Sequence, residues 1–449
     1  MEVTSYTEML RQMFHLSSST RRPRRNGLLA LSPLLLFAIL FVTTSLYAGD
    51  FYAIPMSVVF IVTTAYALLI TRDLPVEKRL SVFSRGASDT NIMTMVWIFV
   101  MAGAFSASAQ DMGAIDATVS LARRLLPGNF QMAGMFIASC FVSMSIGTSV
   151  GTIVTLVPIA VGLSTALNLD LAMMVAVVTG GAFFGDNLSF ISDTTIVSTR
   201  TQGCQLNDKF KANIRIVLPA ALLTLALYTY LGIHMPTPSV APPDFNLWKV
   251  VPYLAVLVMA LCGMNVLIVL AIGNLLTGVI GLLTVGHFTL SAWFISMGKG
   301  ITSMGELIII SMIAGGLLEL IRHNGGITYL MRAITQHVRG KRGAELAIAA
   351  LVGIANLCTA NNTVAILSVG KLSKHIAVRY HIDRRKSASI LDTTSCCVQG
   401  VLPYGAQLLM AAGLSGLNPV GIIPYLYYPF LVGASTLLCI LFRLPRKYS

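Results

Sequence analysis

The chain has 449 residues, of which 55% are hydrophobic and only 11% are charged, and its mean hydropathy is +0.77. Soluble domains carry roughly 25% charged residues, so this composition excludes a soluble globular protein and indicates one that crosses a membrane many times. The net charge of +13 does not indicate nucleic-acid binding, because the basic residues cluster in short loops beside apolar runs, as the positive-inside rule describes.

The N-terminal segment 1–26 is polar and contains the basic run Arg21–Arg25. It lacks a short apolar core followed by a small-residue cleavage site, so we expect a cytoplasmic tail rather than a signal peptide. Apolar runs of about 17 to 25 residues, long enough to cross a bilayer, then recur along the chain. We predict ten spans, which begin near Gly27, Ala53, Asn91, Leu171, Ile214, Val250, Ile272, Glu306, Ser387 and Val420.

An internal repeat divides the chain into two halves. The segments that begin at Met101 and Ile313 align without gaps at an offset of 212, which pairs Gly113 with Gly325. Polar stretches follow in the same order in both halves. We therefore predict two repeats with the same sequence of elements.

The basic residues predict how the two repeats are oriented. Of the 31 lysines and arginines, 27 fall in six groups that can all lie on one side of the membrane, which the positive-inside rule makes the cytoplasmic side. The Pro-rich linker has no lysine or arginine, so the second half starts outside and the first inside. This is an inverted-topology repeat, an architecture of many secondary transporters. The predicted units are a cytoplasmic tail (1–26), a first repeat (27–232), an extracytoplasmic linker (233–246), a second repeat (247–442) and a cytoplasmic C-terminal tail (443–449).

Each repeat is predicted to contain a re-entrant hairpin. The segment 344–370 has basic loops on both flanks and is too short for two full spans. The hairpin tip falls at Thr359–Thr363, and the counterpart in Gln131–Leu167 enters from the opposite face; four short spans are the alternative. The predicted fold is an all-α polytopic membrane protein with about five transmembrane helices and one hairpin per half. Amphipathic arm helices are expected at 111–127 and 323–338.

Two polar stretches, "FFGDNLSFISDTT" and "ILDTTSCCVQGVLPYG", interrupt apolar helices. Carboxylates inside hydrophobic spans are costly and mark functional sites. At an offset of 206 the stretches pair Asp186 with Asp392 and place Asp193 opposite Gln399, and their glycines favour broken helices. A spacing of i, i+3 and i+7 should place three polar residues of each stretch on one helix face: Asp186, Ser189 and Asp193, and Asp392, Ser395 and Gln399.

The polar groups favour a hard cation as cargo. Hydroxyl, amide and carboxylate oxygens suit Na⁺ or H⁺ better than soft transition metals, and a desolvated carboxyl stays neutral until a cation compensates its charge. A proton can therefore exchange for Na⁺, which predicts Na⁺/H⁺ antiport without a cofactor. The candidate binding residues are Asp186, Asn187, Ser189, Asp193, Thr194, Asp392, Ser395 and Gln399, with Thr148, Ser149, Thr152, Asn361, Asn362 and Thr363 at the hairpin tips. Among these, Asp186, Asp392, Asn362 and Thr363 are the Na⁺ candidates.

Three other interpretations stay open. Asp193 or Asp186 would serve only as a helix cap if its side chain bonded the backbone of the second helix segment. A Na⁺- or H⁺-coupled transporter of an amino acid or small organic acid would use the same polar groups. An intramembrane aspartyl protease would use Asp186 and Asp392, but the first glycine of its GxGD pattern is missing here. We expect a transporter and not an enzyme.

The stretch "GDNLSFISDTT" resembles the signature of the NhaC family of Na⁺/H⁺ antiporters, although the family usually has Pro in place of Phe190. "LDTTSCCVQGVLPYG" is a looser match, and the resemblance covers about residues 27–442. It implies the fold of the ion transporter superfamily, often a homodimer, in which an Asn-Thr pair similar to Asn362–Thr363 helps bind Na⁺. We expect a bacterial inner-membrane protein with both termini cytoplasmic, whose partners are lipid and the transported Na⁺, H⁺ or small solute.

Overall fold

The computed structural model describes residues 27–48, 55–125, 128–190, 192–234, 244–286, 288–336, 338 and 340–444. All regular secondary structure in these ranges is helical, which confirms the predicted all-α class. The predicted N-terminal tail, most of the linker and the end of the chain from 445 onward lie outside the described ranges.

The first half contains ten α-helices in its described residues. Their bounds are α2 (Gly27–Ala48), α3 (Met56–Ile70), α4 (Val76–Ala87), α5 (Thr90–Asp111), α6 (Ala114–Leu125), α7 (Gln131–Ile146), α8 (Ser149–Leu167), α9 (Leu171–Leu188), α10 (Asp193–Gln202) and α11 (Leu206–His234).

The second half has the same order with one short helix added. Its helices are α12 (Val251–Leu261), α13 (Val266–Thr284), α14 (Leu290–Ser303), α15 (Gly305–His323), α16 (Gly326–Thr335), α17 (Gly340–Thr359), α18 (Asn362–Arg379), α19 (Arg384–Gly400), α20 (Ala406–Ser415), α21 (Pro419–Ile422) and α22 (Tyr427–Leu441). Helices α14 and α4 occupy the same place in their halves, and the ten predicted spans omitted both.

The backbone of the first half recurs in the second at a nearly constant offset in residue number. Helix α9 begins at Leu171 and α19 at Arg384, while α10 and α20 begin at Asp193 and Ala406, so both pairs differ by 213. Residues in the left-handed region recur at an offset of 212 or 213, in four pairs: Gly113 and Gly325, Gly147 and Ala360, Asn168 and His381, Gly203 and Gly416. Because left-handed backbone is rare outside glycine, four matching positions are strong evidence for a structural repeat.

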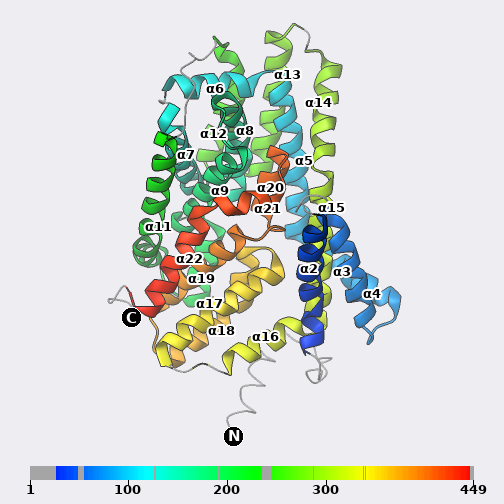
Figure 1. Ribbon diagram of the computed structural model, residues 1–449, viewed down its shortest axis with the longest axis vertical. Coiled ribbons are helices and arrows are strands. Elements are labelled where there is room, and N and C mark those ends of the chain that lie inside the picture. Colours follow the sequence, from blue (N-terminus) through cyan, green and yellow to red (C-terminus); the bar gives the residue numbers. More distant parts are fainter. Residues whose placement is uncertain are drawn as a thin grey trace.

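The halves pack against each other reciprocally. Helix α4 lies along α15 while its counterpart α14 lies along α5, and α10 packs on α18 while α20 packs on α8. In Figure 1 the arm α6 and the hairpin α7–α8 lie toward the upper end, whereas α16 and α17–α18 lie at the lower end. Both predicted arm regions are helical.

Seven helical stretches in the described ranges are long and apolar enough to cross a membrane, and two of them join consecutive helices, α9 with α10 and α14 with α15. The number is eight if the bent pair formed by α20 and Pro419–Tyr425 counts as one span. The predicted ten spans include several helices shorter than that threshold, such as α3 and α22. Helix α9 runs through the centre of the molecule, since each of residues 173–188 is buried. It is the element on which the site is built.

Candidate functional site

Both predicted broken helices are present, but their breaks differ. Helix α9 ends at Leu188, Ser189 is extended, and the helix resumes at Asp193. Helix α19 continues to Gly400 and ends before Pro403, which cannot donate to a continuing helix. The expectation that Asp186, Ser189 and Asp193 share one helix face is therefore wrong, because the break separates them. Asp392, Ser395 and Gln399 do lie in one uninterrupted helix.

The structure also changes which residues are counterparts. The offset of 213 that relates the hairpin tips pairs Asp186 with Gln399, and not with Asp392. A contact made in both halves supports this register: Ser143 Oγ donates to the carbonyl of Ala182 at 2.6 Å. Its equivalent is the bond from Asn356 Nδ2 to the carbonyl of Ser395, also 2.6 Å. The predicted pairing at an offset of 206 aligned similar amino acids, whereas equivalent backbone positions of the two halves are 213 residues apart.

Asp186 lies against the first hairpin. Its side chain is 4% exposed, and Oδ1 accepts a hydrogen bond from the backbone N–H of Ser149 at 3.0 Å. Ser149 is the first residue of α8, so the carboxyl faces the positive end of that helix. Gly185 lets α9 pack closely on α7, the other helix of this hairpin, because a Cβ at Gly185 would overlap Ser143.

Asp392 forms a fully buried ion pair that the sequence analysis did not predict. Its Oδ2 lies 2.8 Å from Lys209 Nζ, and the two side chains are 0% and 1% exposed. Asn213 Nδ2 donates to the same oxygen at 2.7 Å. Both donors also bond the carbonyl of Asn187, at 3.1 and 2.8 Å, and Lys209 reaches Thr195 Oγ1 at 2.7 Å. The Lys209–Asp392 pair is thereby tied to the end of α9.

A chain of amides connects the two hairpin tips. Gln407 Nε2 donates to Ser149 Oγ at 3.0 Å, and Gln407 Oε1 accepts from Gln399 Nε2 at 2.9 Å. Gln399 Nε2 also donates to the carbonyl of Ala360 at 3.0 Å. Ser149 and Ala360 belong to opposite halves, so the two glutamines form a continuous hydrogen-bonded connection between the hairpins.

Several acceptor oxygens of the buried cluster have no hydrogen-bond donor in the described structure. Asp392 Oδ1, Asn187 Oδ1 and Gln399 Oε1 are buried without a hydrogen-bond partner in the described structure. Buried polar atoms are usually satisfied, and oxygen acceptors of this kind are the ligands that a small hard cation takes. No three His, Cys, Asp or Glu side chains gather in the described ranges, so such a cation would bind mainly amide and backbone oxygens beside one carboxylate.

A model of the Na⁺/H⁺ antiporter family matches residues 21–233 and 241–444. The chain belongs to the Na⁺/H⁺ antiporter family. It is 23% identical to the Na⁺/H⁺ antiporter NhaC of Bacillus subtilis, over 76% of this chain and 81% of that protein. It is also 23% identical to NhaC of Alkalihalophilus pseudofirmus, over 66% and 71%. A malate-2H⁺/Na⁺-lactate antiporter of Bacillus subtilis is 20% identical, over 68% and 71%. The predicted resemblance is confirmed, and the chain is a secondary active transporter.

In this member of the antiporter family, the first-half candidates separate into buried and exposed groups. Asn187 Nδ2 donates to Tyr428 OH at 2.9 Å, Ser189 Oγ bonds the carbonyl of Met144 at 2.8 Å, and Thr194 lies 3.0 Å from Ser192. Asp193 is exposed and is the first residue of α10, after the cap residue Ser192. Its carboxylate thus lies in the first turn of α10, outside the buried cluster, and the cap position itself is taken by Ser192.

The hairpin-tip candidates mostly shape the backbone. Thr148 and Asn361 are the N-cap residues of α8 and α18, and only Asn361 bonds its helix, through Val364 N–H at 3.0 Å. Thr152 Oγ1 donates to the carbonyl of Thr148, and Ser395 Oγ donates to the carbonyl of Asp392. Asn362 Oδ1 accepts from the N–H of Thr363, and its Nδ2 lies 4.0 Å from Cys396 Sγ. The described contacts do not bring Asn362 or Thr363 to either aspartate.

A second buried ion pair, also missed, joins Glu345 of α17 to Lys386 of α19 at 3.0 Å, with both side chains 1% exposed. The charge pattern placed Lys209 and Lys386 in loops, and both are instead internal. The spacing of residues around Lys209 does indicate an inward position. Lys209 precedes Asn213 by four residues, on the helix face that also carries the apolar Ile216 and Val217.

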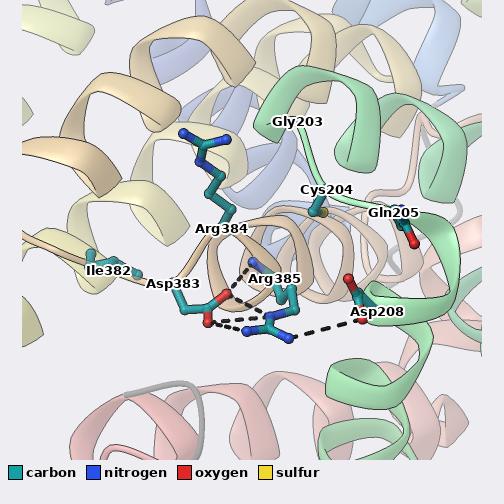
Figure 2. A pocket seen from close by; sticks show the side chains of 8 residues that line it. All are labelled: Gly203, Cys204, Gln205, Asp208, Ile382, Asp383, Arg384 and Arg385. Atoms are coloured by element: carbon teal, nitrogen blue, oxygen red, sulfur yellow. Dashed lines mark hydrogen bonds and ion pairs between the residues drawn. The ribbon is translucent and has the colours of Figure 1, made fainter.

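An open pocket of about 650 Å³ lies where α11 and α19 begin. Figure 2 shows Arg385 between Asp383 and Asp208, with Oδ2 of Asp383 2.9 Å and Oδ1 of Asp208 4.0 Å from its guanidinium. Asp208 lines the pocket, and the next residue, Lys209, lies in the buried cluster. The pocket is thus adjacent along the chain to the ion pair.

Proposed function

We propose that this protein exchanges Na⁺ for H⁺ at the buried cluster around Asp186 and Asp392. The observation that carries the proposal is the Lys209–Asp392 pair, in which one carboxylate oxygen is held by Lys209 and the other has no partner in the described structure. A buried carboxylate needs a positive partner, and Lys209 is a cation that cannot leave the protein.

Lys209 acts in this proposal as an internal substitute for Na⁺. An entering Na⁺ neutralises Asp392 through Oδ1 and the free Oδ1 of Asn187, and it competes with the ammonium group for the carboxylate. Lys209 keeps two other acceptors, the carbonyl of Asn187 and Thr195 Oγ1, so it can move without losing all of its hydrogen bonds. When Na⁺ leaves, the ion pair forms again.

Asp186 is the proton-exchanging group in this scheme. Its carboxyl bonds Ser149, and no basic side chain in the described residues forms an ion pair with it. A buried carboxyl without a counter-ion is neutral or binds a cation. Thr195 Oγ1 accepts a hydrogen bond from Lys209 at 2.7 Å and donates one to the backbone carbonyl of Asp186 at 3.4 Å, so it links the ion pair to the backbone of the proton-exchanging residue.

The repeat suggests how the site changes sides. We propose that the halves are inverted in the membrane, so that the hairpins α7–α8 and α17–α18 reach the site from opposite faces, and that an elevator-like or rocking motion exposes it alternately. The pocket beside Asp208 and Arg385 would be the cytoplasmic approach to Lys209. We further propose a bacterial inner-membrane location with cytoplasmic termini, and a homodimer by analogy with the family.

A second candidate is transport of a small organic solute coupled to Na⁺ or H⁺. One relative is named for malate and lactate exchange, and the Gln399–Gln407 pair presents amides that an organic solute can bond. Proteoliposomes distinguish the two: an imposed Na⁺ gradient should move protons without any added solute. If proton flux appears only when malate, lactate or an amino acid is supplied, the solute carrier is correct and bare antiport is wrong.

A further inference from the structure

The two halves carry unlike groups at equivalent positions beside their hairpins. Asp186 of α9 and Gln399 of α19 differ by 213 in residue number, as do the left-handed tip residues Gly147 and Ala360. Each touches the hairpin of its own half: Asp186 accepts from Ser149 N–H, and Gln399 donates to the carbonyl of Ala360. The repeat therefore provides two matching places for an ion-binding side chain, and only one of them holds a group that ionises.

Gln399 fills its place with hydrogen bonds that need no charge. Its Nε2 donates to Ala360 and to Gln407 Oε1, while Oε1 is buried without a partner in the described structure. A glutamate at position 399 would place its carboxylate against two acceptor oxygens, the carbonyl of Ala360 and Gln407 Oε1. Such an arrangement is unfavourable unless the acid is protonated, a cation binds, or Gln407 turns its amide.

We infer that Gln399 limits the number of cations exchanged in each cycle, because it keeps the second-half position neutral. This inference rests on the proposed antiport at Asp186 and names the residue that sets its stoichiometry. It follows that a carboxyl introduced at position 399 adds one proton or one Na⁺ to the cycle.

The test compares Gln399→Glu with the wild type in proteoliposomes. The measured quantity is the ratio of H⁺ to Na⁺, obtained from the pH gradient that just stops net flux against an imposed Na⁺ gradient. We expect the ratio to change by one ion in Gln399→Glu. It should be unchanged in Gln399→Met, which removes the amide but stays neutral, and in Gln336→Glu, which makes the same chemical change at an exposed position. A folded Gln399→Glu protein with the wild-type ratio would overturn the inference.

A charge-swapped variant keeps the test decisive if Gln399→Glu folds poorly. In the double variant Asp186→Gln with Gln399→Glu, the number of buried carboxyls equals that of the wild type. We expect it to restore at least part of the exchange that Asp186→Gln loses. If the folded double variant exchanges nothing while the wild type does, position 399 is not equivalent to 186 and the inference is wrong. Failure of the wild type itself to exchange Na⁺ for H⁺ would refute the proposed function instead.

Discussion

Lys209 and Asp392 form an ion pair 2.8 Å long in the interior of the protein, although they lie far apart in the chain. The pair joins α11 of the first half to α19 of the second. A buried pair of this kind contributes little net stability, because desolvation opposes the attraction, but removing one partner is strongly destabilising. The proposed competition between Lys209 and Na⁺ supplies a functional reason for a pair that apolar residues could replace.

Lys209→Met should destabilise the protein by about 3 to 5 kcal/mol, because it leaves the Asp392 carboxylate buried without a partner. The double variant Lys209→Met with Asp392→Asn should recover part of this loss, since both charges are then gone. Thermal unfolding in detergent measures both effects. The matched control is Lys211→Met, which removes an exposed lysine from the same helix and should change stability by less than about 0.5 kcal/mol.

The same variant separates a purely structural ion pair from one that competes with Na⁺. If Lys209 substitutes for Na⁺, added Na⁺ should raise the melting temperature of Lys209→Met more than that of the wild type, because no ammonium competes for the site. K⁺ at equal ionic strength corrects for salt screening. Equal shifts in the two proteins would remove Lys209 from the transport scheme.

Asp186→Asn should lower Na⁺/H⁺ exchange by more than about tenfold, a loss of at least ~1.4 kcal/mol in the cycle, while the protein stays folded. An asparagine still offers Ser149 N–H an acceptor oxygen but can no longer release a proton. Asp193→Asn should change the rate by less than about twofold, because that carboxylate is exposed beyond the break in α9. Exchange rates in proteoliposomes measure both, and equal losses in the two variants would contradict the separation of Asp186 from Asp193.

The sequence was sufficient to locate the breaks of both hairpins. The predicted tip Thr359–Thr363 contains the left-handed residue Ala360, and the left-handed Gly147 directly precedes the tip candidates Thr148 and Ser149. Glycine and several polar residues clustered within an apolar run favour an interruption of the helix. The broken helices at the two aspartate stretches follow from the same argument. These features are local, so a pattern of residue types along the chain is enough to find them.

The partners of the site residues could not be found in this way. The pairing of Asp186 with Asp392 rests on similar amino acids at an offset of 206. The helices of the two halves instead begin 213 residues apart, which makes Gln399 the equivalent of Asp186. Lys209 falls in one of the six basic groups, so the positive-inside rule places it in a cytoplasmic loop. The spacing to Asn213 indicates a helix face, but the partners of its ammonium group come from α9 and α19, which only the packing of α11 between them reveals.

The hairpin tips offer a pair of reciprocal substitutions. Ala360 is in the left-handed region, with φ near 50°, where its counterpart Gly147 has φ 76°. Left-handed backbone costs a residue with a Cβ about 1–2 kcal/mol, so Gly147→Ala should destabilise the protein by about 1 kcal/mol. Ala360→Gly should be neutral or stabilising by up to about 1 kcal/mol, after the entropy that glycine adds to the unfolded chain. Thermal unfolding measures both, and a large loss in Ala360→Gly would show that the Cβ of Ala360 is needed for packing.

Asp383 should make part of the stability depend on pH from outside the buried cluster. It caps α19 through Arg385 N–H at 2.8 Å and pairs with the Arg385 guanidinium at 2.9 Å. Burial alone would raise the pKa of Asp383, but the hydrogen bonds and charge of Arg385 outweigh it and hold the pKa below its ordinary value. A lowered pKa means that the ionised form is bound more tightly in the folded state. The contribution of Asp383 to the free energy of unfolding is therefore complete above about pH 4, the pKa of Asp in an unfolded chain. It is lost as the pH falls through the lower pKa that Asp383 has in the folded protein.

Asp383→Ala should cost about 1 kcal/mol at neutral pH, because the cap is lost, and the difference from the wild type should shrink as the pH falls below about 4. Asp383→Asn is the matched control, since asparagine caps helices well but does not ionise in this range. Unfolding midpoints measured from neutral to acidic pH test the sign directly. A gap between wild type and Asp383→Ala that stays constant or grows in acid would contradict the assignment. Because Asp383 lines the open pocket and not the Asp186–Asp392 cluster, an acid response of transport that persists in Asp383→Asn does not arise from Asp383.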